Sequence, residues 1–466
     1  MAEIDTRTAE IGSPEWWLVR LHKRLDARSI DIALLDDYYN GQQQIRYAME
    51  RWRKAFSKQF RHFSENAMPL VVDSVEERID VVGFQVGGEF DKATWALWQR
   101  NQMDAESQLA HMESLITAYA YAMVWNEDDA EGRARITVES PYETIVEYAS
   151  GDRRKRASAL KVFRDDSTGR LFATVYLPEG VWKYQSTRPV DEGRRLGAQE
   201  VMWETREPAG EDWPLANPFG KVPVVALENR RRLGRAPRSE IADVLTTQDA
   251  INKLSMDLLV ASEFAAFRQR YLIGVEEPKD PKTGQVVSDY WKQALEAFII
   301  IPNADGRVGS IEATDLTNYV AAIEHEIQQV ATRTKTPPHY FFLRGEFPSG
   351  ESIVAAEAGL VAKARRRMRH WSDAWEEVVS MARQIEGLGS TPAAAIETMW
   401  RDPESRTEAQ HVDAVGKKRS LLEIPLEQAW EDVGYRPDQI ARLREMRARE
   451  LAGASPSDGA QGGPAG

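Results

Sequence analysis

The chain has 466 residues, of which 42% are hydrophobic and 29% charged, a composition typical of globular proteins and long enough for several folding units. No apolar run approaches the roughly 20 residues of a membrane span, and the absence of Cys excludes disulfides and thiolate chemistry. The 60 basic and 73 acidic residues leave a net charge of −13, whereas a protein that grips DNA through its phosphates normally has a basic surface.

The acidic balance has two interpretations. It keeps the protein soluble, or it forms a wall past which DNA slides without being trapped. The polar start of the chain, residues 1–14, does not resemble a secretory signal, and with the lack of Cys it favours synthesis in a reducing cytoplasm.

Residues 14–120 are predicted to be mostly helical. Ser13 followed by Pro14 is typical of a helix start. Apolar side chains then recur at helical spacing at Trp17, Leu21 and Leu25. Further helices are predicted from about residue 67, near 92–101 and at 104–121.

Between about residues 122 and 228 the pattern becomes that of an antiparallel sheet. Apolar and polar residues alternate at 135–139, 160–163, 171–176 and 181–184, as they do in half-buried strands. Residues 166–169, DSTG, are predicted to form a turn. The segment NPFGKVP at 217–223 is predicted to be an extended connector, because its two prolines are unsuited to a central strand.

Two long helices with an insert between them are predicted after residue 238. Ser239 is expected to cap the first helix, with Glu240 and Asp243 near its positive end, and the helix to run to about residue 270. The second spans about 315–333. Their apolar stripes include Ile241, Leu254, Leu258, Ile323 and Ile327. Strand-like runs at 271–275 and 298–301 predict a small α/β insert.

An aromatic-rich loop follows the second helix. Pro337 and Pro338 forbid its continuation, and the loop extends to about residue 350. A third long helix is predicted at about 351–386, ended by Gly387. The final segment, 453–466, is rich in Gly, Ala, Ser and Pro and is expected to be disordered.

No motif supports a catalytic, cofactor or metal site. His325 begins a zinc-protease pattern, but Gln329 stands where the second His is required. The pairs Asp36–Asp37 and Asp165–Asp166 are more typical of solvated turns than of a two-metal nuclease. The basic run at 363–370, KARRRMRH, surrounds its helix, so its cations face DNA or pair with acidic neighbours and adjacent subunits. We favour pairing.

Several motifs in their order resemble those of the portal proteins of long-tailed bacteriophages, over about residues 15–390. They are LLDDYYNG at 34–41, FSEN at 63–66, PLVVD at 69–73, NPFGKVP at 217–223 with ENR at 228–230, and TKTPP at 334–338 followed by PSGES at 348–352. The family often has a second Ser where Gly350 stands.

The resemblance implies an α+β, mainly helical portal fold. It has an antiparallel β-sheet wing, long stem helices, a small α/β clip and a helical C-terminal crown. The implied boundaries are a flexible N-terminus at 1–13, a wing at 14–237, stem helices at 238–270 and 313–335, a clip at 271–312, a tunnel loop at 336–350, a long wing and crown helix at 351–388, a crown at 389–452 and a disordered tail at 453–466.

The implied function is non-enzymatic. The family forms a ring, normally of twelve subunits, at one capsid vertex, through which DNA is packaged and ejected. The implied partners are double-stranded DNA, the terminase large subunit, a head–tail adaptor, and the major capsid and scaffold proteins, in the virion and, during assembly, in the host cytoplasm. No cofactor, metal or membrane is implied.

Two groups of residues are expected to carry this function. Those expected to face DNA are Lys335, Pro337, His339, Arg344 and Phe347. Those expected to pack between subunits are Ile241, Leu254, Leu258, Ile323 and Ile327, because a two-helix stem cannot bury all its apolar surface alone. The alternatives are a helical scaffold or adaptor that does not contact DNA, and a nuclease with a cryptic acid cluster.

Overall fold

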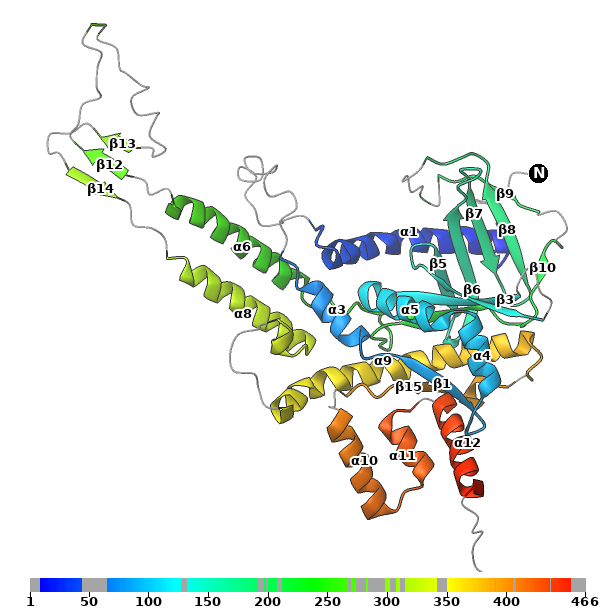
Figure 1. The fold of residues 1–466 in the computed structure, drawn as a ribbon. Helices are drawn as coiled ribbons and strands as arrows, with labels where there is room; N and C mark the ends of the chain where they lie inside the picture. The colour runs from blue at the N-terminus through cyan, green and yellow to red at the C-terminus, as the bar shows by residue number, and fades with distance from the viewer. Residues whose placement is uncertain are drawn as a thin grey trace, which may run out of the picture. The chain divides into compact units, whose positions relative to one another are not determined.

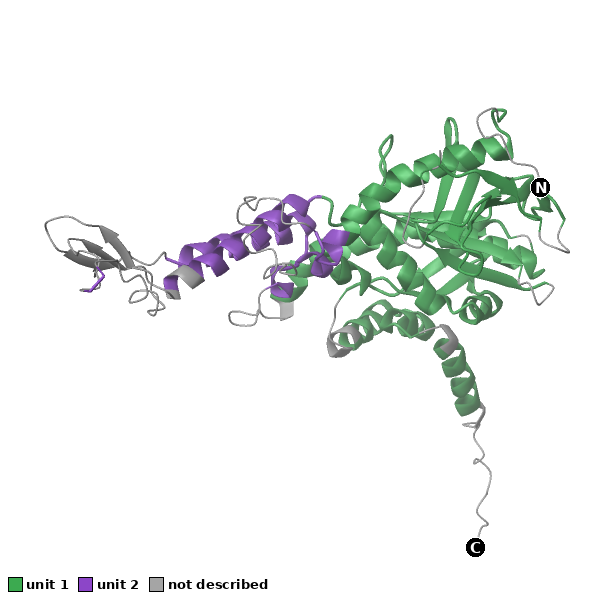
Figure 2. Ribbon diagram, turned by 90° about the horizontal axis from the view of Figure 1, so that it is seen from above, with its two compact units in different colours: residues 1–36, 71–242, 344–466 green, residues 37–70, 243–343 purple. Residues whose placement is uncertain are grey.

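The computed structural model divides into two compact units, which Figure 2 shows in different colours. Unit 1 comprises residues 1–36, 71–242 and 344–466, and unit 2 comprises residues 37–70 and 243–343. The described residues are 9–43, 65–126, 132–191, 197, 200–207, 212–266, 270–273, 282–283, 298–301, 307–310, 315–341, 350–389, 391–404, 408–435 and 437–453.

The first helix, α1 (Pro14–Tyr39), begins where the sequence predicts (Figure 1). The backbone N–H of Trp16 donates to the Ser13 hydroxyl at 3.2 Å, which confirms Ser13 as the cap. Leu18, Leu21 and Leu25 are buried in one core cluster with side chains of the largest sheet. The apolar spacing of α1 therefore fixes the helix against that sheet.

Unit 1 contains antiparallel sheets in the region where the sequence predicts them. One sheet has the strand order β10-β8-β7-β6-β5, and β9 also pairs with β8. Its strands are β5 (Thr144–Ala149), β6 (Asp152–Arg164), β7 (Leu171–Tyr176), β8 (Gly180–Ser186), β9 (Trp203–Thr205) and β10 (Leu215–Ala216). A second sheet joins β11 (Val224–Glu228), β3 (Tyr119–Asn126) and β4 (Ala134–Glu139). The mixed helix-and-sheet class is confirmed.

Two expectations for unit 1 were wrong. The helix expected at 104–121 is α5 (Met103–Thr117), because Ala118 adopts a left-handed conformation with φ 79° and β3 begins at Tyr119. A further sheet also lies in segments expected to be helical. It pairs β1 (Val81–Val86) with β2 (Glu89–Phe90) and with β15 (Ile396–Trp400). The region after residue 388 is therefore not purely helical.

The long helix α9 (Gly350–Ile385) contacts strands of two sheets in unit 1, β3, β4, β11 and β15. Trp371, Trp375 and Val378 are fully buried on it. Its end near Gly387, which has a φ of 66°, matches the prediction. The remaining described helices of unit 1 are α3 (Met68–Glu76), which begins in unit 2, α4 (Lys92–Arg100), α10 (Glu408–Leu422), α11 (Leu426–Val433) and α12 (Pro437–Gly453).

Unit 2 contains the helical hairpin of α6 (Leu245–Ala266) and α8 (Thr317–Thr334). The first helix was expected to begin at Ser239 but begins at Leu245. A three-stranded sheet lies in the sequence between the helices: β12 (Arg270–Ile273) pairs in parallel with β13 (Phe298–Ile301) and antiparallel with β14 (Arg307–Ser310). Strands at β12 and β13 were predicted, whereas β14 was not. No helix in the described ranges has both the length and the apolarity to cross a membrane.

Candidate functional site

The hairpin of unit 2 leaves apolar side chains on its surface. Ile323 is buried in the single chain, with 8% of its surface exposed, whereas Leu254, Leu258 and Ile327 are half-buried. Leu259 and Val320 are the most accessible of the large apolar residues described on these helices, at 36% and 37% exposure. The single hairpin therefore leaves part of its apolar surface exposed to solvent.

Ile241 does not belong to this surface. It lies before α6 and is fully buried within the chain, so the expectation that it faces a neighbouring subunit from a stem helix is corrected. The Ser239 hydroxyl accepts from the Ile241 N–H at 3.2 Å, but residues 239–244 are not helical and α6 begins at Leu245, so the Ser239 N-cap prediction is wrong.

A buried polar seam occupies another face of α6, within unit 2. Gln248 Oε1 accepts from the Ala67 N–H at 3.0 Å, and Asn252 Oδ1 accepts from the Glu65 N–H at 3.1 Å. The Ser255 hydroxyl donates to the Glu65 carboxylate at 2.9 Å. Sequence reasoning missed this seam, although polar residues at helical spacing signal a non-apolar face. It holds residues 65–67 against the helix.

The segment after α8 turns sharply away from the helix. Lys335 adopts a left-handed conformation with φ 59°, and the Thr336 N–H donates to the Ala331 carbonyl at 3.1 Å. Residues Pro338–Tyr340 then form one 3₁₀ turn. The two prolines and the left-handed residue together end α8, as predicted.

The expected DNA-facing residues differ in accessibility. Lys335 is exposed, and His339 is half-buried with its ring 4.9 Å from that of Tyr340. Pro337 is buried, so its ring does not face a ligand in this conformation, and its assignment to a DNA-facing surface is corrected. Arg344 and Phe347 lie outside the described residues.

The basic run at 363–370 is largely paired within unit 1. Lys363 lies 3.0 Å from the Glu240 carboxylate, and Arg367 Nε donates to the same carboxylate at 2.7 Å. Arg365 pairs with acidic residues after β15, at 2.7 Å from Glu404. The pairing interpretation therefore holds for these three cations.

Glu240 is a buried anion at the centre of this cluster. Burial alone would raise the pKa of its carboxyl group, but the charges of Lys363 and Arg367 outweigh burial and lower the pKa to about 2. Asn229 Nδ2 adds a hydrogen bond at 3.1 Å. The sequence placed Glu240 at a helix start, and no local signal indicated a partner more than 100 residues away.

The candidate nuclease acids have structural contacts. Asp165 accepts from the Ser167 hydroxyl at 2.6 Å and from the Thr168 N–H at 2.9 Å, which closes the β6–β7 turn. Asp36 accepts from the Tyr142 hydroxyl. Within the described ranges, no three His, Asp or Glu side chains are grouped so that they could hold a metal ion.

A buried aromatic cluster surrounds His111 on α5. The Trp375 indole N–H donates to His111 Nε2 at 3.0 Å, and the Trp371 ring stacks on the imidazole at 4.7 Å. Burial lowers the pKa of His111 to about 3, so it is neutral here. Because His111 Nε2 accepts its hydrogen bond from a core tryptophan, we assign His111 to packing rather than to catalysis.

Comparison with known proteins gives matches along most of the chain. Residues 20–451 match the family described as phage portal protein, SPP1 Gp6-like. The portal protein of Mycobacterium phage D29 is 31% identical over 399 residues, which cover 81% of this chain and 77% of that protein. The portal protein of Mycobacterium phage L5 is 29% identical over 404 residues, covering 82% and 78%.

Among solved structures, a chain in the neck of a native GTA particle, computed with C12 symmetry, aligns with a TM-score of 0.44 and 11% identity. The alignment covers 79% of this chain and 90% of that chain.

Proposed function

The chain belongs to the SPP1 Gp6-like family of phage portal proteins, and from that membership we propose how its parts are used in the ring. It is a portal ring subunit of a virion. The observation that carries this function is the family match over residues 20–451, together with the 31% identity to the D29 portal protein across most of both chains. The activity is structural: the ring forms the channel for DNA at one capsid vertex.

We infer the following division of the chain. The sheets of unit 1 with α1 and α9 form the wing, α6 and α8 form the stem, the β12–β14 sheet belongs to the clip, and α10 to α12 belong to the crown. Support comes from a helical hairpin that carries a small sheet between its helices in sequence and ends at a proline-rich segment. The ring is proposed to contain twelve subunits, the number usual for the family.

The apolar surface of the hairpin is proposed to pack against neighbouring subunits. Leu254, Leu258 and Ile327 are half-buried in the single chain, and a second copy would remove their remaining surface from water. Ile323 supports this contact from inside the hairpin. Leu259 and Val320 extend the set first inferred from the sequence.

The segment 336–350 is proposed to line the narrowest part of the channel. Lys335 is exposed at its start, His339 lies on its 3₁₀ turn, and Arg344 is the residue expected to meet phosphate. One such cation per subunit, repeated around a ring, gives a shallow periodic attraction that permits sliding. Phe347 is proposed to shape the same constriction.

The partners are proposed from the family. They are the terminase large subunit and a head–tail adaptor at the clip, the major capsid and scaffold proteins at the wing, and double-stranded DNA in the channel. Assembly is proposed to take place in the host cytoplasm.

Electron microscopy of the purified protein tests the proposed ring. We expect closed rings with a central hole, whereas particles without a hole would favour the scaffold or adaptor alternative.

Complementation of a phage that lacks its portal gene tests the channel. Arg344→Glu should leave rings intact but reduce the yield of full heads, because it places an anion where phosphate passes. A normal yield of full heads would show that Arg344 does not contact DNA.

A further inference from the structure

The segment after β11 concentrates positive charge in unit 1. Residues 230–238, RRRLGRAPR, contain five arginines. Arg230 donates to the Ser239 carbonyl at 3.2 Å, and Arg231 lies 2.8 Å from the Glu228 carboxylate. Arg232 and Arg235 are exposed, and neither forms an ion pair with any residue that the structure describes. These two cations are therefore available to a partner.

The backbone holds Arg232 and Arg235 opposite each other. They form an isolated antiparallel bridge, and the Arg235 N–H donates to the Arg232 carbonyl at 3.4 Å. Gly234, at the turn, has a φ of 65°, a conformation that favours glycine. Like charges placed directly opposite across two strands repel each other, so an anion bound between them would relieve a local cost.

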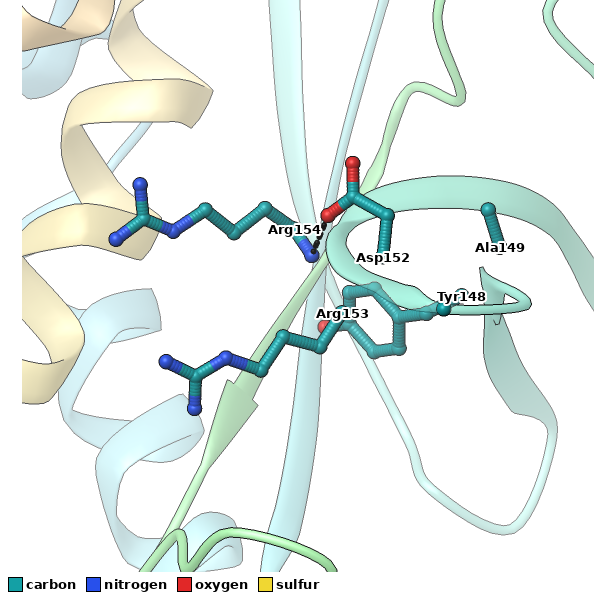
Figure 3. A pocket seen from close by; sticks show the side chains of 6 residues that line it. Tyr148, Ala149, Asp152, Arg153 and Arg154 are labelled. Carbon is teal, nitrogen blue, oxygen red and sulfur yellow. Dashed lines mark hydrogen bonds between the residues drawn. The ribbon is translucent and has the colours of Figure 1, made fainter.

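The β5–β6 hairpin carries a second group of unpaired cations. Arg153 and Arg154 line a pocket of about 470 Å³ together with Tyr148 and Asp152. Figure 3 shows the two arginine side chains extending to the same side of the hairpin, while the Asp152 carboxylate accepts from the backbone N–H of Arg154 at 2.9 Å. Both guanidinium groups are exposed and have no ion-pair partner within the described part of the chain.

The third group lies on α9, where Arg366 and Arg369 are exposed on the helix whose Arg367 is buried and whose Lys363 is half-buried. The strand β11, which leads into residues 230–238, contacts both β5 of the hairpin and α9. Burial lowers the pKa of His370, and the charges of Arg367, Arg231 and Arg366 lower it further against the opposing charge of Asp373. The three groups of arginines therefore lie on neighbouring elements of unit 1, although they are distant in sequence.

We propose that these arginines form a basic patch that binds the phosphate backbone of double-stranded DNA. The patch consists of Arg153, Arg154, Arg232, Arg235, Arg366 and Arg369. The proposal rests on the portal function, since it assumes that the subunit meets DNA. It adds a second DNA-contacting surface, outside residues 336–350.

The chemistry favours nucleic acid over an acidic protein. The planar guanidinium group binds phosphate through two hydrogen bonds, and cations from three segments suit a polymer of phosphates better than a single anion. Protein interfaces have apolar centres depleted of charge. Within residues 152–154, 230–238 and 366–369, Leu233 is the large apolar side chain with high exposure, at 77%.

Binding of a fluorescent 30-base-pair duplex to purified full-length rings tests the patch. We expect Arg232→Glu/Arg235→Glu to weaken binding at low salt about tenfold or more and to lower the slope of log K against log salt by about 2. Arg153→Glu/Arg154→Glu should act in the same direction. The matched control is Arg442→Glu/Arg447→Glu, which changes two exposed arginines on α12 and alters the net charge equally.

The outcomes separate the explanations. Weaker binding in both patch variants with intact rings, and a change below about twofold in the control, supports the patch. Equal weakening in the control would mean that net charge alone determines the affinity for DNA. Unchanged binding in the patch variants would mean that these arginines do not contact DNA. Either result overturns the proposal. Rings that dissociate in Arg232→Glu/Arg235→Glu would instead assign the loop to a contact between copies. Ring formation by the wild type is measured separately, so a result against the basic patch does not count against the portal function.

Discussion

The Glu240 carboxylate holds two buried cations of α9, and its removal should be costly. Glu240→Gln leaves Lys363 and Arg367 without their counter-charge in a site from which water is excluded. We expect the free energy of unfolding to fall by about 3 kcal/mol at pH 7, as measured by urea unfolding followed by tryptophan fluorescence. Arg365→Ala, at a pair whose side chains are 45% and 27% exposed, is the control and should cost less than about 1 kcal/mol.

The pH dependence gives a second measure of Glu240. Its folded-state pKa, about 2, lies below the ordinary value of 4.5. Its contribution to stability is therefore complete above about pH 4.5 and is lost as the pH falls toward 2. The difference between the wild type and Glu240→Gln should shrink between pH 5 and pH 3. A constant difference over this range would contradict the assigned charge state.

His111 should make unit 1 sensitive to mild acid. Its pKa of about 3 lies below the ordinary 6.5, so its contribution to stability is complete above pH 6.5 and declines as the pH falls. This residue should lower the free energy of unfolding by up to about 1.4 kcal/mol per pH unit between pH 6 and pH 5. His111→Gln should remove that part of the slope. The same change at exposed His325 is the control, and equal slopes in all three proteins would contradict the prediction.

At the level of elements, α8 has an inner and an outer apolar face that can be tested separately. Val320→Asp places a charge on the exposed face and should weaken ring assembly about tenfold or more, because the charge would have to lose water in the contact. The helical content of the isolated subunit should not change. Mass photometry and circular dichroism measure the two effects.

Two further variants of α8 serve as controls for Val320→Asp. Gln328→Asp changes an exposed polar position of the same helix and should leave rings intact. Ile323→Asp buries a charge within the hairpin and should reduce helical content as well as assembly. If Val320→Asp assembles as well as Gln328→Asp does, this face of α8 is not a contact between subunits.

Local sequence signals predicted the helices and the strands of the central region well. Ser13 and the two prolines at 337–338 mark where helices begin and end through their own hydrogen bonding and ring geometry. The pairing of β1 with β15 could not be predicted, because it joins Val86 to Ile396 and depends on long-range contacts. The pairing of Glu240, adjacent to the predicted cap, with Arg367 of α9 depends on long-range contacts in the same way.

The candidate site was predictable to different degrees. Helical periodicity placed Leu254, Leu258 and Ile327 on the apolar faces of the two helices. It could not separate them from Ile241, which packs inside unit 1. Proline chemistry located the bend after α8, whereas the burial of Pro337 depends on its packing. The pairing of the 363–370 run required knowledge of Glu240 and Glu404, which are remote in sequence.

At the scale of the whole molecule, the net charge of −13 should oppose ring assembly and should also limit DNA binding. Each chain carries −13, so a ring of twelve copies at −13 each would total −156. Self-repulsion of this kind weakens as salt shortens the Debye length from about 30 Å at 0.01 M to about 8 Å at 0.15 M. The apolar contact proposed for α6 and α8 is much less sensitive to salt, so rings should form more readily as salt rises over this range.

DNA binding should respond in the opposite direction, because each phosphate contact releases counterions whose return is favoured by salt. Sedimentation velocity of the protein alone at the two salt concentrations measures the fraction in rings, and a parallel titration with duplex DNA measures binding. We expect the fraction in rings to rise while binding falls. Rings that dissociate as salt rises would mean that ion pairs between subunits, rather than the apolar faces of α6 and α8, dominate the contact.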